Sequence, residues 1–445
     1  MAEAPHHAML QLLGSRRFLP LFATQFLGAL NDNVLKAATV ILLTFQTAAW
    51  TSLDAGVLAN LAGGLFILPF FLFSALAGQL ADRHDKALIA RRVKALEILI
   101  VLVAGAGFAL HSLTVLLGAI GLLGLHSTFF GPVKYAILPQ HLNPHELTAG
   151  NALIEAGTFI AILAGTILGG VLAAHPKAGP AIFAGGLAIA LLGYCTSRAI
   201  PPAPADPAAL NAPLQALGET WRSLRRLADD ETIRLATLGI SWFWLYGAVL
   251  LAQIPALARQ ALGGGESSVT LMLTGFTLGV SAGSILCTRL PRRTWAALWP
   301  LAGALGLSVF GIDLALTTPA THTGVIGEQG LDIARMLASP GSLHLMADLL
   351  MIGACGGLFI VPLYTLMQAH ASQSHRSRTI ATNNIVNALF MVAGSGLAGT
   401  ALARGAHLSS LFVTLAIGNL AGAVWVGWRL RHRLLRDQSA PEAAA

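Results

Sequence analysis

The stretch LAGGLFILPFFLFSALAGQLADRHDK, which occupies residues 61–86, decides the fold class. It begins as an apolar run without charged side chains and ends in a turn that carries Asp82, Arg83, Asp85 and Lys86. A helix needs about 20 apolar residues to cross the hydrocarbon core of a bilayer. The run is long enough for one crossing, and we predict that the helix reaches water where the charges begin.

The whole chain has the composition of a membrane protein. Of its 445 residues, 55% are hydrophobic and only 11% are charged, whereas soluble domains carry roughly 25% charged residues. The apolar stretches continue well beyond the roughly ten alternating residues of a membrane barrel strand. We therefore predict an all-α integral membrane protein.

Twelve apolar stretches have the length of a membrane helix. We place them at residues 18–46, 53–80, 89–110, 113–138, 147–174, 178–199, 231–261, 268–290, 294–316, 343–369, 378–403 and 406–430. The predicted domains are an N-terminal six-helix half, a cytoplasmic linker, a C-terminal six-helix half and a tail, at residues 1–199, 200–230, 231–436 and 437–445. The linker is Pro-rich and then charged, which predicts a short amphipathic helix on the membrane surface.

Basic residues lie mainly on one side of the predicted membrane. If the N-terminus is cytoplasmic, most of the 27 Lys and Arg residues, among them Arg91, Arg92 and Lys94, fall on the cytoplasmic side. Such a bias is typical of membrane proteins and predicts that both termini are cytoplasmic. It also accounts for the net charge of +7 without nucleic-acid binding, because the basic residues follow span ends in small groups.

Motifs for catalysis, nucleotide binding and metal binding are missing from the sequence. It has no G-x-x-x-x-G-K-[ST] phosphate loop, no G-x-S-x-G elbow and no H-E-x-x-H pair. Its three cysteines, Cys195, Cys287 and Cys355, are too far apart to suggest a metal or disulfide framework. We therefore expect no enzyme activity, no cofactor and no metal site.

The two halves repeat short polar signatures in the same order. The fifth span opens with Asn151 and has Glu155 four residues later, and the eleventh opens with Asn383 and has Asn387 four residues later. The turn after the second span is echoed after the eighth. Two repeated halves with a substrate site between them are typical of alternating-access transporters. We predict such a transporter, with Asn383 and Asn387 as its C-terminal substrate contacts.

The first predicted span carries polar residues that a membrane helix rarely tolerates. Asn31, Asp32 and Asn33 stand together, and Lys36 follows one turn later. Asp32 and Lys36 are four residues apart on one helix face, so one interpretation is a structural ion pair. Charges within a bilayer are costly and mark functional sites. Three consecutive polar residues exceed what one pair needs, which favours a substrate or ion site in a cavity.

Two further spans supply candidate substrate contacts. Lys134 and Tyr135 follow Pro132, which removes a backbone hydrogen bond and is expected to break the fourth span. Lys134 either binds a phosphate group or extends to the cytoplasmic surface. Glu155 lies deeper in the fifth span, where it either pairs with Lys134 or Lys36 or binds a coupling ion, H⁺ or Na⁺.

The turn after the second span is the candidate gate. Its predicted gating residues are Gly78, Asp82, Arg83, Asp85 and Lys86. In one interpretation, Asp82 binds the end of a neighbouring helix while Arg83 pairs across the turn, and together they hold one conformation. In the other, the turn is an ordinary basic connection on the cytoplasmic surface.

These residues carry a family resemblance. GQLADRHDK, residues 78–86, resembles the loop signature G-x-L-a-D-r-x-g-r/k-k of the major facilitator superfamily, with Asp85 in place of the usual Gly. Four blocks resemble the bacterial lysophospholipid transporter (LplT) family and cover most of the N-terminal half: FLPLFATQFLGALNDNVLKAATVILLTF, GQLADRHDKALIARRVKALEI, STFFGPVKYAILPQHL and GNALIEAGTFIAILAGTILGG. The C-terminal half fits through SWFWLYGAVLLAQIP.

The resemblance implies the major facilitator fold and the flipping of lysophospholipids, chiefly lysophosphatidylethanolamine, across the inner membrane of Gram-negative bacteria. It also implies reacylation inside the cell by an acyltransferase/acyl-carrier-protein synthetase, which we expect to be a separate partner. Lysine side chains would meet the phosphate of the lipid, and a carboxylate would meet its ammonium group. Two alternatives stay open, namely an efflux transporter of drugs or metabolites and a non-transporting scaffold for the acyltransferase.

Overall fold

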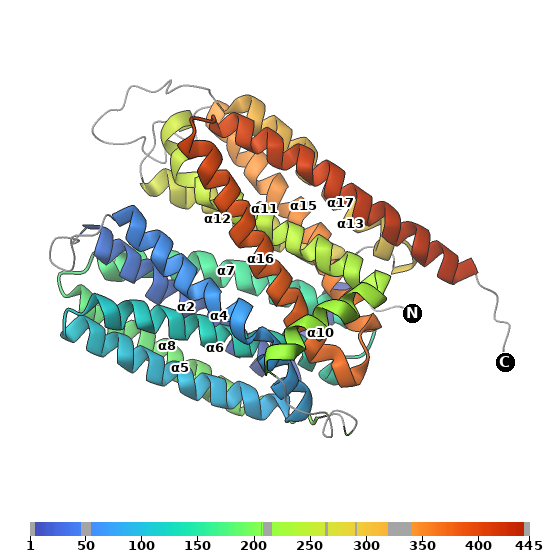
Figure 1. Ribbon diagram of the computed structural model, residues 1–445, viewed down its shortest axis with the longest axis horizontal. Coiled ribbons are helices and arrows are strands. Elements are labelled where there is room, and N and C mark those ends of the chain that lie inside the picture. The colour runs from blue at the N-terminus through green and yellow to red at the C-terminus, as the bar shows by residue number, and fades with distance from the viewer. Residues whose placement is uncertain are drawn as a thin grey trace. The chain divides into compact units, whose positions relative to one another are not determined.

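The computed structural model describes residues 5–45, 55–205, 207, 216–262, 266–289, 292–318 and 340–439, and all regular structure in these ranges is helical (Figure 1). The long helices are α2 (Leu19–Phe45), α4 (Ala55–Arg83), α5 (Lys86–Ala109), α6 (Leu113–His141), α7 (Leu147–Ala173), α8 (Ala178–Arg198), α11 (Glu231–Leu262), α12 (Glu266–Leu286), α13 (Arg292–Thr317), α15 (Pro340–His370), α16 (Arg376–Ala403) and α17 (Leu408–Ser439). Each of them overlaps one predicted span, which confirms the all-α prediction.

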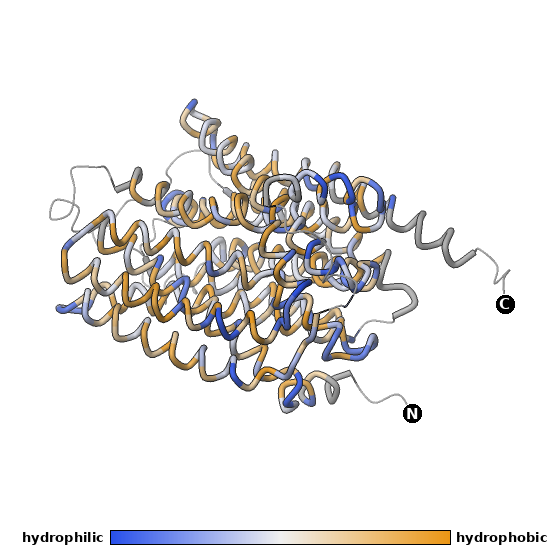
Figure 2. The backbone as a smooth tube through the Cα atoms, turned by 60° about the horizontal axis from the view of Figure 1, so that its bottom comes forward, coloured by the Kyte–Doolittle hydropathy of each residue, from blue (hydrophilic) through white to orange (hydrophobic). Residues whose placement is uncertain are grey.

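Ten of these helices are long and apolar enough to cross a bilayer. The remaining two are α2, which contains Asp32 and Lys36, and α5, which contains Lys94 and Glu97. Figure 2 shows hydrophobic residues along most of the helix lengths and hydrophilic residues gathered chiefly where helices end. The protein is thus a multi-pass membrane protein, while the count of twelve crossings stays a prediction.

Shorter helices flank the long ones. They are α1 (Pro5–Gly14), α10 (Ala216–Asp229) and two short 3-10 helices, Cys287–Arg289 and Gln373–His375. The predicted linker contains α10, which packs against α4 and carries an exposed Trp221 with the guanidinium of Arg225 5.1 Å from its ring centre. Residues 206 and 208–215 of the linker and 440–445 of the tail lie outside the described residues.

Local sequence explains where several helices begin and how α6 continues. Asp85 precedes α5 and accepts the N–H of Leu88 at 3.1 Å, which is an N-terminal cap. Ser112 caps α6 in the same way. The helix break expected at Pro132 is wrong, because α6 runs without interruption to His141. Packing of α6 against α4 and α5 supports this stretch, as neighbouring helices do for proline in membrane spans.

An ion pair connects the turn before α2 to the residue that precedes α7. Arg17 donates two hydrogen bonds to Glu146, at 2.7 and 2.5 Å, and the N–H of Asn143 donates to the same carboxylate at 2.9 Å. Burial by itself would raise the pKa of Glu146, but these hydrogen bonds and the charge of Arg17 outweigh it and hold the pKa below its ordinary value. The carboxylate is therefore charged at neutral pH.

The helices form two compact units. Unit 1 comprises Met1–Gly150, Gly157–Asp229 and Ala371–Ala388, and unit 2 comprises Asn151–Ala156, Asp230–His370 and Leu389–Ala445. The first helices of the chain therefore lie mostly in unit 1 and the last ones mostly in unit 2. Both α7 and α16 contribute a segment to each unit.

Both units pack equivalent helices against each other. Unit 1 pairs α4 with α6, α5 with α6, α5 with α8 and α2 with α8. Unit 2 pairs α12 with α15, α13 with α15, α13 with α17 and α11 with α17. Counted along each half, these are the second with the fourth helix, the third with the fourth, the third with the sixth and the first with the sixth. The same pairing in both units is what a structural repeat requires.

Glycines permit the closest of these helix crossings. A Cβ atom at Gly124 of α6 would collide with the backbone oxygen of Phe66 on α4. In unit 2, a Cβ atom at Gly283 of α12 would collide with the backbone oxygen of Ala354 on α15. Small residues let membrane helices approach closely where no hydrophobic effect drives them together. The second and fourth helices of each unit are therefore held backbone to backbone.

Candidate functional site

Three helices of unit 1 bring charged side chains together among apolar residues. Lys94 and Glu97 lie one turn apart on α5, and both side chains are 0% exposed. The Nζ atom of Lys94 is 2.5 Å from Oε2 of Glu97. On α6, Nε2 of His126 is 3.3 Å from the same carboxylate oxygen. A buried carboxylate on α5 thus contacts two nitrogen groups.

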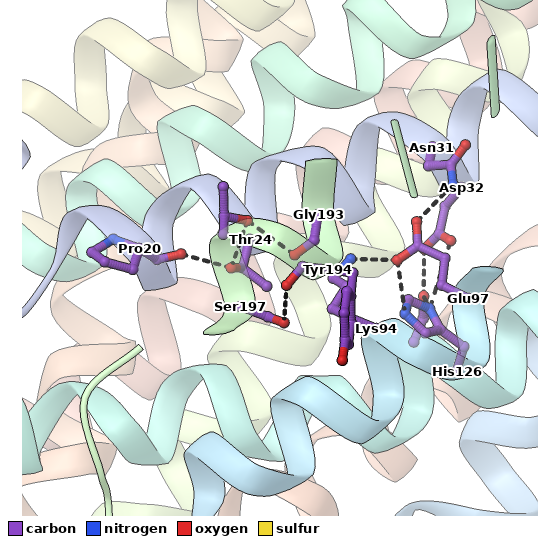
Figure 3. A network of polar contacts seen from close by, with 12 residues as sticks. Pro20, Thr24, Asn31, Asp32, Lys94, Glu97, His126, Gly193, Tyr194 and Ser197 are labelled. Carbon is purple, nitrogen blue, oxygen red and sulfur yellow. Dashed lines mark hydrogen bonds and ion pairs between the residues drawn. The ribbon is translucent and has the colours of Figure 1, made fainter. Parts of the chain in front are cut away.

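The network continues to α2 (Figure 3). Asn31 donates a hydrogen bond from Nδ2 to Oε1 of Glu97 at 2.7 Å. The Nδ1 atom of His126 is 3.9 Å from Oδ1 of Asp32, and the hydroxyl group of Ser127 donates a short hydrogen bond to Oδ2 of Asp32. His126 therefore lies between two carboxylates that come from different helices.

Small and aromatic residues make room for Lys94. A Cβ atom at Gly28 of α2 would collide with its Nζ atom, and one at Gly193 of α8 would lie 3.6 Å from its Cδ atom. The ring centre of Phe130 is 5.4 Å from Nζ, within the range of a cation–π interaction. The sequence therefore provides space for this side chain on two neighbouring helices.

An apolar core closes the network on one side. One turn beyond the polar residues, α2, α5 and α6 place Leu35, Ile100 and Leu123 in a buried hydrophobic cluster. A buried ion pair is weak support for stability, because desolvation of the two charges can exceed their attraction. Ionisable residues within membrane helices are functional by default. The network is therefore the strongest candidate for a functional site in unit 1.

The formal charges of the network balance when Lys36 is included and His126 is neutral. Asp32 and Glu97 carry two negative charges against the one positive charge of Lys94. Lys36, on which the charge of Asp32 also acts, adds a second positive charge, so the formal sum over these side chains is zero with His126 neutral.

Lys36 does not pair with Asp32. Its Nζ atom lies over the ring of Phe66, 4.8 Å from the ring centre. Asp32 turns instead toward α6, where Ser127 donates to it. The direct ion pair offered by one interpretation of their spacing is therefore not formed, although the charge of Asp32 still acts on Lys36.

Other predicted substrate contacts lie outside the network. Asn33 donates to the backbone oxygen of Ala29 on its own helix at 2.8 Å. Lys134 lies on α6, and its Nζ atom is 4.7 Å from the ring centre of the adjacent Tyr135. Glu155 is fully buried in the part of α7 that belongs to unit 2. A substrate role for these residues remains a prediction.

The segment of α16 that belongs to unit 1 carries three asparagines. Asn383 and Asn387 are both buried, and neither side-chain polar atom of Asn383 has a hydrogen-bond partner within the described residues. Between them, Asn384 reaches α6, since a Cβ atom at Gly131 would lie 2.7 Å from its Nδ2 atom. Buried amides in proteins normally have partners. Asn383 could therefore accept or donate to a bound polar group.

The candidate gate meets the start of α16 in unit 1. Asp82 accepts the backbone N–H groups of Ser377 and Arg378 at 3.0 and 3.3 Å, and Nε of Arg378 also lies 3.3 Å from its carboxylate. The first N–H groups of a helix lack partners within the helix and favour an anion. At Gly78, a Cβ atom would lie 2.6 Å from that of Ala381, so glycine permits this approach.

The other candidate gating residues have local contacts. Asp85 caps α5 and accepts the N–H of Ala203 at 3.2 Å, while the N–H of Lys86 donates to the oxygen of Ala203 at 2.9 Å. Arg83 is half-buried at the end of α4. These contacts join the turn to the first residues of the linker. A gating role for the five residues remains a prediction.

Sequence reasoning missed four residues of the network. The charge distribution of the sequence places Lys94 on the cytoplasmic side, and the sequence assigns no role to Glu97, His126 or Ser127. A signal was present, because Lys94 and Glu97 are three residues apart inside the predicted span 89–110. His126 and Ser127 carried no comparable signal, because a lone histidine in an apolar span does not reveal its neighbours.

Comparisons with known proteins agree with this architecture. The family model for the Major Facilitator Superfamily matches residues 21–328. The lysophospholipid transporter LplT of Yersinia pestis (strain Pestoides F) is 27% identical over 363 residues, which cover 81% of this chain and 80% of the relative. LplT of Yersinia pseudotuberculosis serotype I (strain IP32953) matches to the same extent.

Solved structures show the same fold at low identity. The human organic anion transporter MFSD10 (TETRAN) aligns with a TM-score of 0.71 and 16% identity, over 92% of this chain and 99% of that one. A variant of the E. coli fucose:proton symporter FucP aligns with a TM-score of 0.67 and 14% identity, over 94% and 99% of the two chains. With its helical repeat and its match to the family model over most of its length, this chain belongs to the major facilitator superfamily of transporters.

Proposed function

We propose that this transporter moves lysophospholipids across the bacterial inner membrane by alternating access, with both termini in the cytoplasm. The observation that carries the proposal is the similarity to LplT along about four fifths of both chains. The buried network of Asp32, Lys94, Glu97 and His126 supports it, because a polar site inside apolar helices suits an amphiphilic substrate.

The headgroup of a lysophospholipid matches the side chains of unit 1. Its phosphate would bind Lys36 or Lys134, and the ammonium group of an ethanolamine head would bind Asp32. The unsatisfied amide of Asn383 would bind one of its hydroxyl or ester oxygens. The single acyl chain would need only apolar contacts. Each part of the lipid thus has a partner of suitable chemistry.

A proton is the coupling ion that the network favours over Na⁺. His126 lies between Glu97, at 3.3 Å, and Asp32, at 3.9 Å, so a small shift of its ring would connect the two carboxylates. We therefore expect uptake to depend on an imposed pH gradient and to be independent of Na⁺.

A separate acyltransferase/acyl-carrier-protein synthetase is the partner that this function requires. Lysophospholipids accumulate on the side to which they are carried unless an enzyme adds a second acyl chain. Such an enzyme on the cytoplasmic side would keep the lysolipid gradient directed inward. The transporter itself would then need no catalytic residues.

Uptake of labelled lysophosphatidylethanolamine into proteoliposomes tests the proposal. We expect uptake by the wild-type protein and its loss in Asp32→Ala, with Asp32→Asn separating the loss of charge from the loss of the side chain. Glu231→Gln is a matched control, because it removes a carboxylate from a partly exposed ion pair with Arg429 at 3.6 Å. This variant should transport normally.

Two outcomes would count against the proposal. A correctly folded wild-type protein that carries a soluble organic anion but no lysolipid would favour an efflux transporter. Normal lysolipid uptake by Asp32→Ala would support the substrate class but would show that Asp32 on α2 is not needed to bind the substrate. Size-exclusion profiles of each variant before reconstitution would separate a loss of transport from a loss of fold.

A further inference from the structure

A second cluster of ionisable side chains lies in unit 2, where α13 ends and α15 begins. It consists of Asp313 on α13 and of His344 and Asp348 on α15, and we call it the His344 cluster. The Nε2 atom of His344 is 3.0 Å from Oδ2 of Asp313 and 3.7 Å from Oδ2 of Asp348. One ligand atom from each residue lies within 4.8 Å of the others.

From this geometry we propose that the His344 cluster binds a divalent transition-metal cation, with zinc as the best fit. Zinc holds histidine nitrogen and carboxylate oxygen at about 2.0–2.2 Å in tetrahedral sites, so its ligand atoms lie roughly 3.3–3.6 Å apart. The separations of 3.0 and 3.7 Å from His344 to the two carboxylates bracket that range. All three ligand atoms lie within 4.8 Å of one another, so the side chains would draw together to enclose the ion.

Asp348 gives independent support for a bound cation. Its side chain is 3% exposed, and Oδ2, the atom that faces His344, has no hydrogen-bond partner within the described residues. A buried carboxylate oxygen without a partner is costly. A second carboxylate, Asp313, adds like charge beside it. A divalent cation would satisfy the oxygen and compensate both charges.

The partial exposure of the cluster would let a metal ion enter and a water molecule bind as its fourth ligand. The side chains of His344 and Asp313 are 50% and 43% exposed, while Asp348 closes the site from within. Water can therefore reach the ion and complete a four-coordinate shell. One histidine and two carboxylates suit zinc better than calcium or magnesium, which prefer oxygen ligands alone. Copper and nickel would compete in solution, since affinity follows the general order for divalent metals.

The proposed metal ion would connect two helices that already pack together. Asp313 lies four residues before the end of α13, and His344 and Asp348 lie in the first three turns of α15. A shared ion would replace the exposed contact between His344 and Asp313 with three coordinate bonds, one to α13 and two to α15. Binding to the folded state alone raises its stability in proportion to the logarithm of free metal concentration. Metal should therefore raise the unfolding temperature of the whole chain.

Zinc binding by the purified full-length protein tests this inference without a transport assay. After treatment with EDTA and its removal, zinc is titrated against a chromophoric chelator, and thermal unfolding is followed with and without zinc. We expect one zinc ion per chain and a higher unfolding temperature with zinc. Asp348→Asn and His344→Ala should each weaken binding by more than the roughly 10–100-fold loss typical of an outer-shell change.

His407→Ala is the matched control, because His407 is an exposed histidine at the start of α17 and lies outside the cluster. It should leave zinc affinity unchanged. Equal zinc affinity in wild type, Asp348→Asn and His344→Ala would overturn the proposal and identify adventitious binding. An unfolding temperature that responds to these substitutions but not to zinc would also overturn it, and would identify an ion pair with a proton shared between the carboxylates.

Discussion

Replacing Glu97 with Gln should destabilise the protein strongly, because the carboxylate is the centre of the buried network. Glu97 contacts Lys94 at 2.5 Å, His126 at 3.3 Å and Asn31 at 2.7 Å, and the side chains of Lys94 and Glu97 are both 0% exposed. The substitution keeps the shape and the hydrogen bond from Asn31. It removes the counter-charge and leaves the Lys94 ammonium buried among apolar residues.

The expected loss follows from what a buried, unpaired charge costs. Removing one partner of a buried ion pair costs about 3–5 kcal/mol. At about 2 °C or more per kcal/mol for domains of 150–250 residues, the unfolding temperature of Glu97→Gln should fall by about 6 °C or more. The unfolding temperature of Lys94→Met should fall by a similar amount, because this substitution leaves the carboxylate of Glu97 buried without its counter-charge.

The double variant Lys94→Met/Glu97→Gln distinguishes a charge effect from a packing effect. If the two charges act as a pair, the double variant should lose much less stability than the sum of the single losses. Scanning fluorimetry of the detergent-purified variants measures all three. Glu231→Gln is the control, because a partly exposed pair contributes about 0–1 kcal/mol. Additive losses, or an unchanged unfolding temperature for Glu97→Gln, would refute the reasoning.

Three further substitutions test contacts outside the network. Gly124→Ala should destabilise by about 1–3 kcal/mol in thermal unfolding, because its Cβ would meet the backbone of Phe66, which cannot move aside like a side chain. Asp82→Asn should slow transport and destabilise by about 1.5–3 kcal/mol, because charged hydrogen bonds to the start of α16 are lost. Glu146→Gln should lower the unfolding temperature slightly at pH 7. This difference in unfolding temperature should disappear as the pH falls below about 4. Glu146 has a lowered pKa in the folded state, so its ion pair with Arg17 stabilises the protein while the carboxylate is charged and is lost when the carboxylate is protonated.

Much of the fold could be predicted from the sequence because a bilayer restricts what a chain can do. Every span needs a long apolar run, and charged turns mark where the runs end, so α4 could be placed from residues 61–86. The effect of Pro132 could not be predicted, because it depends on whether neighbouring helices support the weakened turn. In α6 they do, and the helix continues.

The candidate site was predicted only in part, because sequence spacing describes one helix at a time. Asp32 is a candidate because of its cost inside a membrane, and the contact of Asp82 with a neighbouring helix end is one of the two interpretations that the sequence leaves open. The partner of Asp32 was not found. Lys36 is nearer along the chain, but Ser127 on α6 is nearer in space, and that fact depends on how α2 and α6 pack.

The two repeats share their packing but differ in chemistry, and that difference indicates where ligands act. Where α13 meets α17, Asn419 donates to the oxygen of Ala304 and to Ser308 at 2.7 and 2.8 Å and accepts from Trp242 at 3.0 Å. This neutral cluster has its hydrogen bonds satisfied and needs no ligand. In unit 1, by contrast, Oδ1 of Asp32 accepts no hydrogen bond within the described residues. A polar cluster whose hydrogen bonds are satisfied can act as a rigid support. The charged network around Asp32 is therefore the one expected to respond to a headgroup.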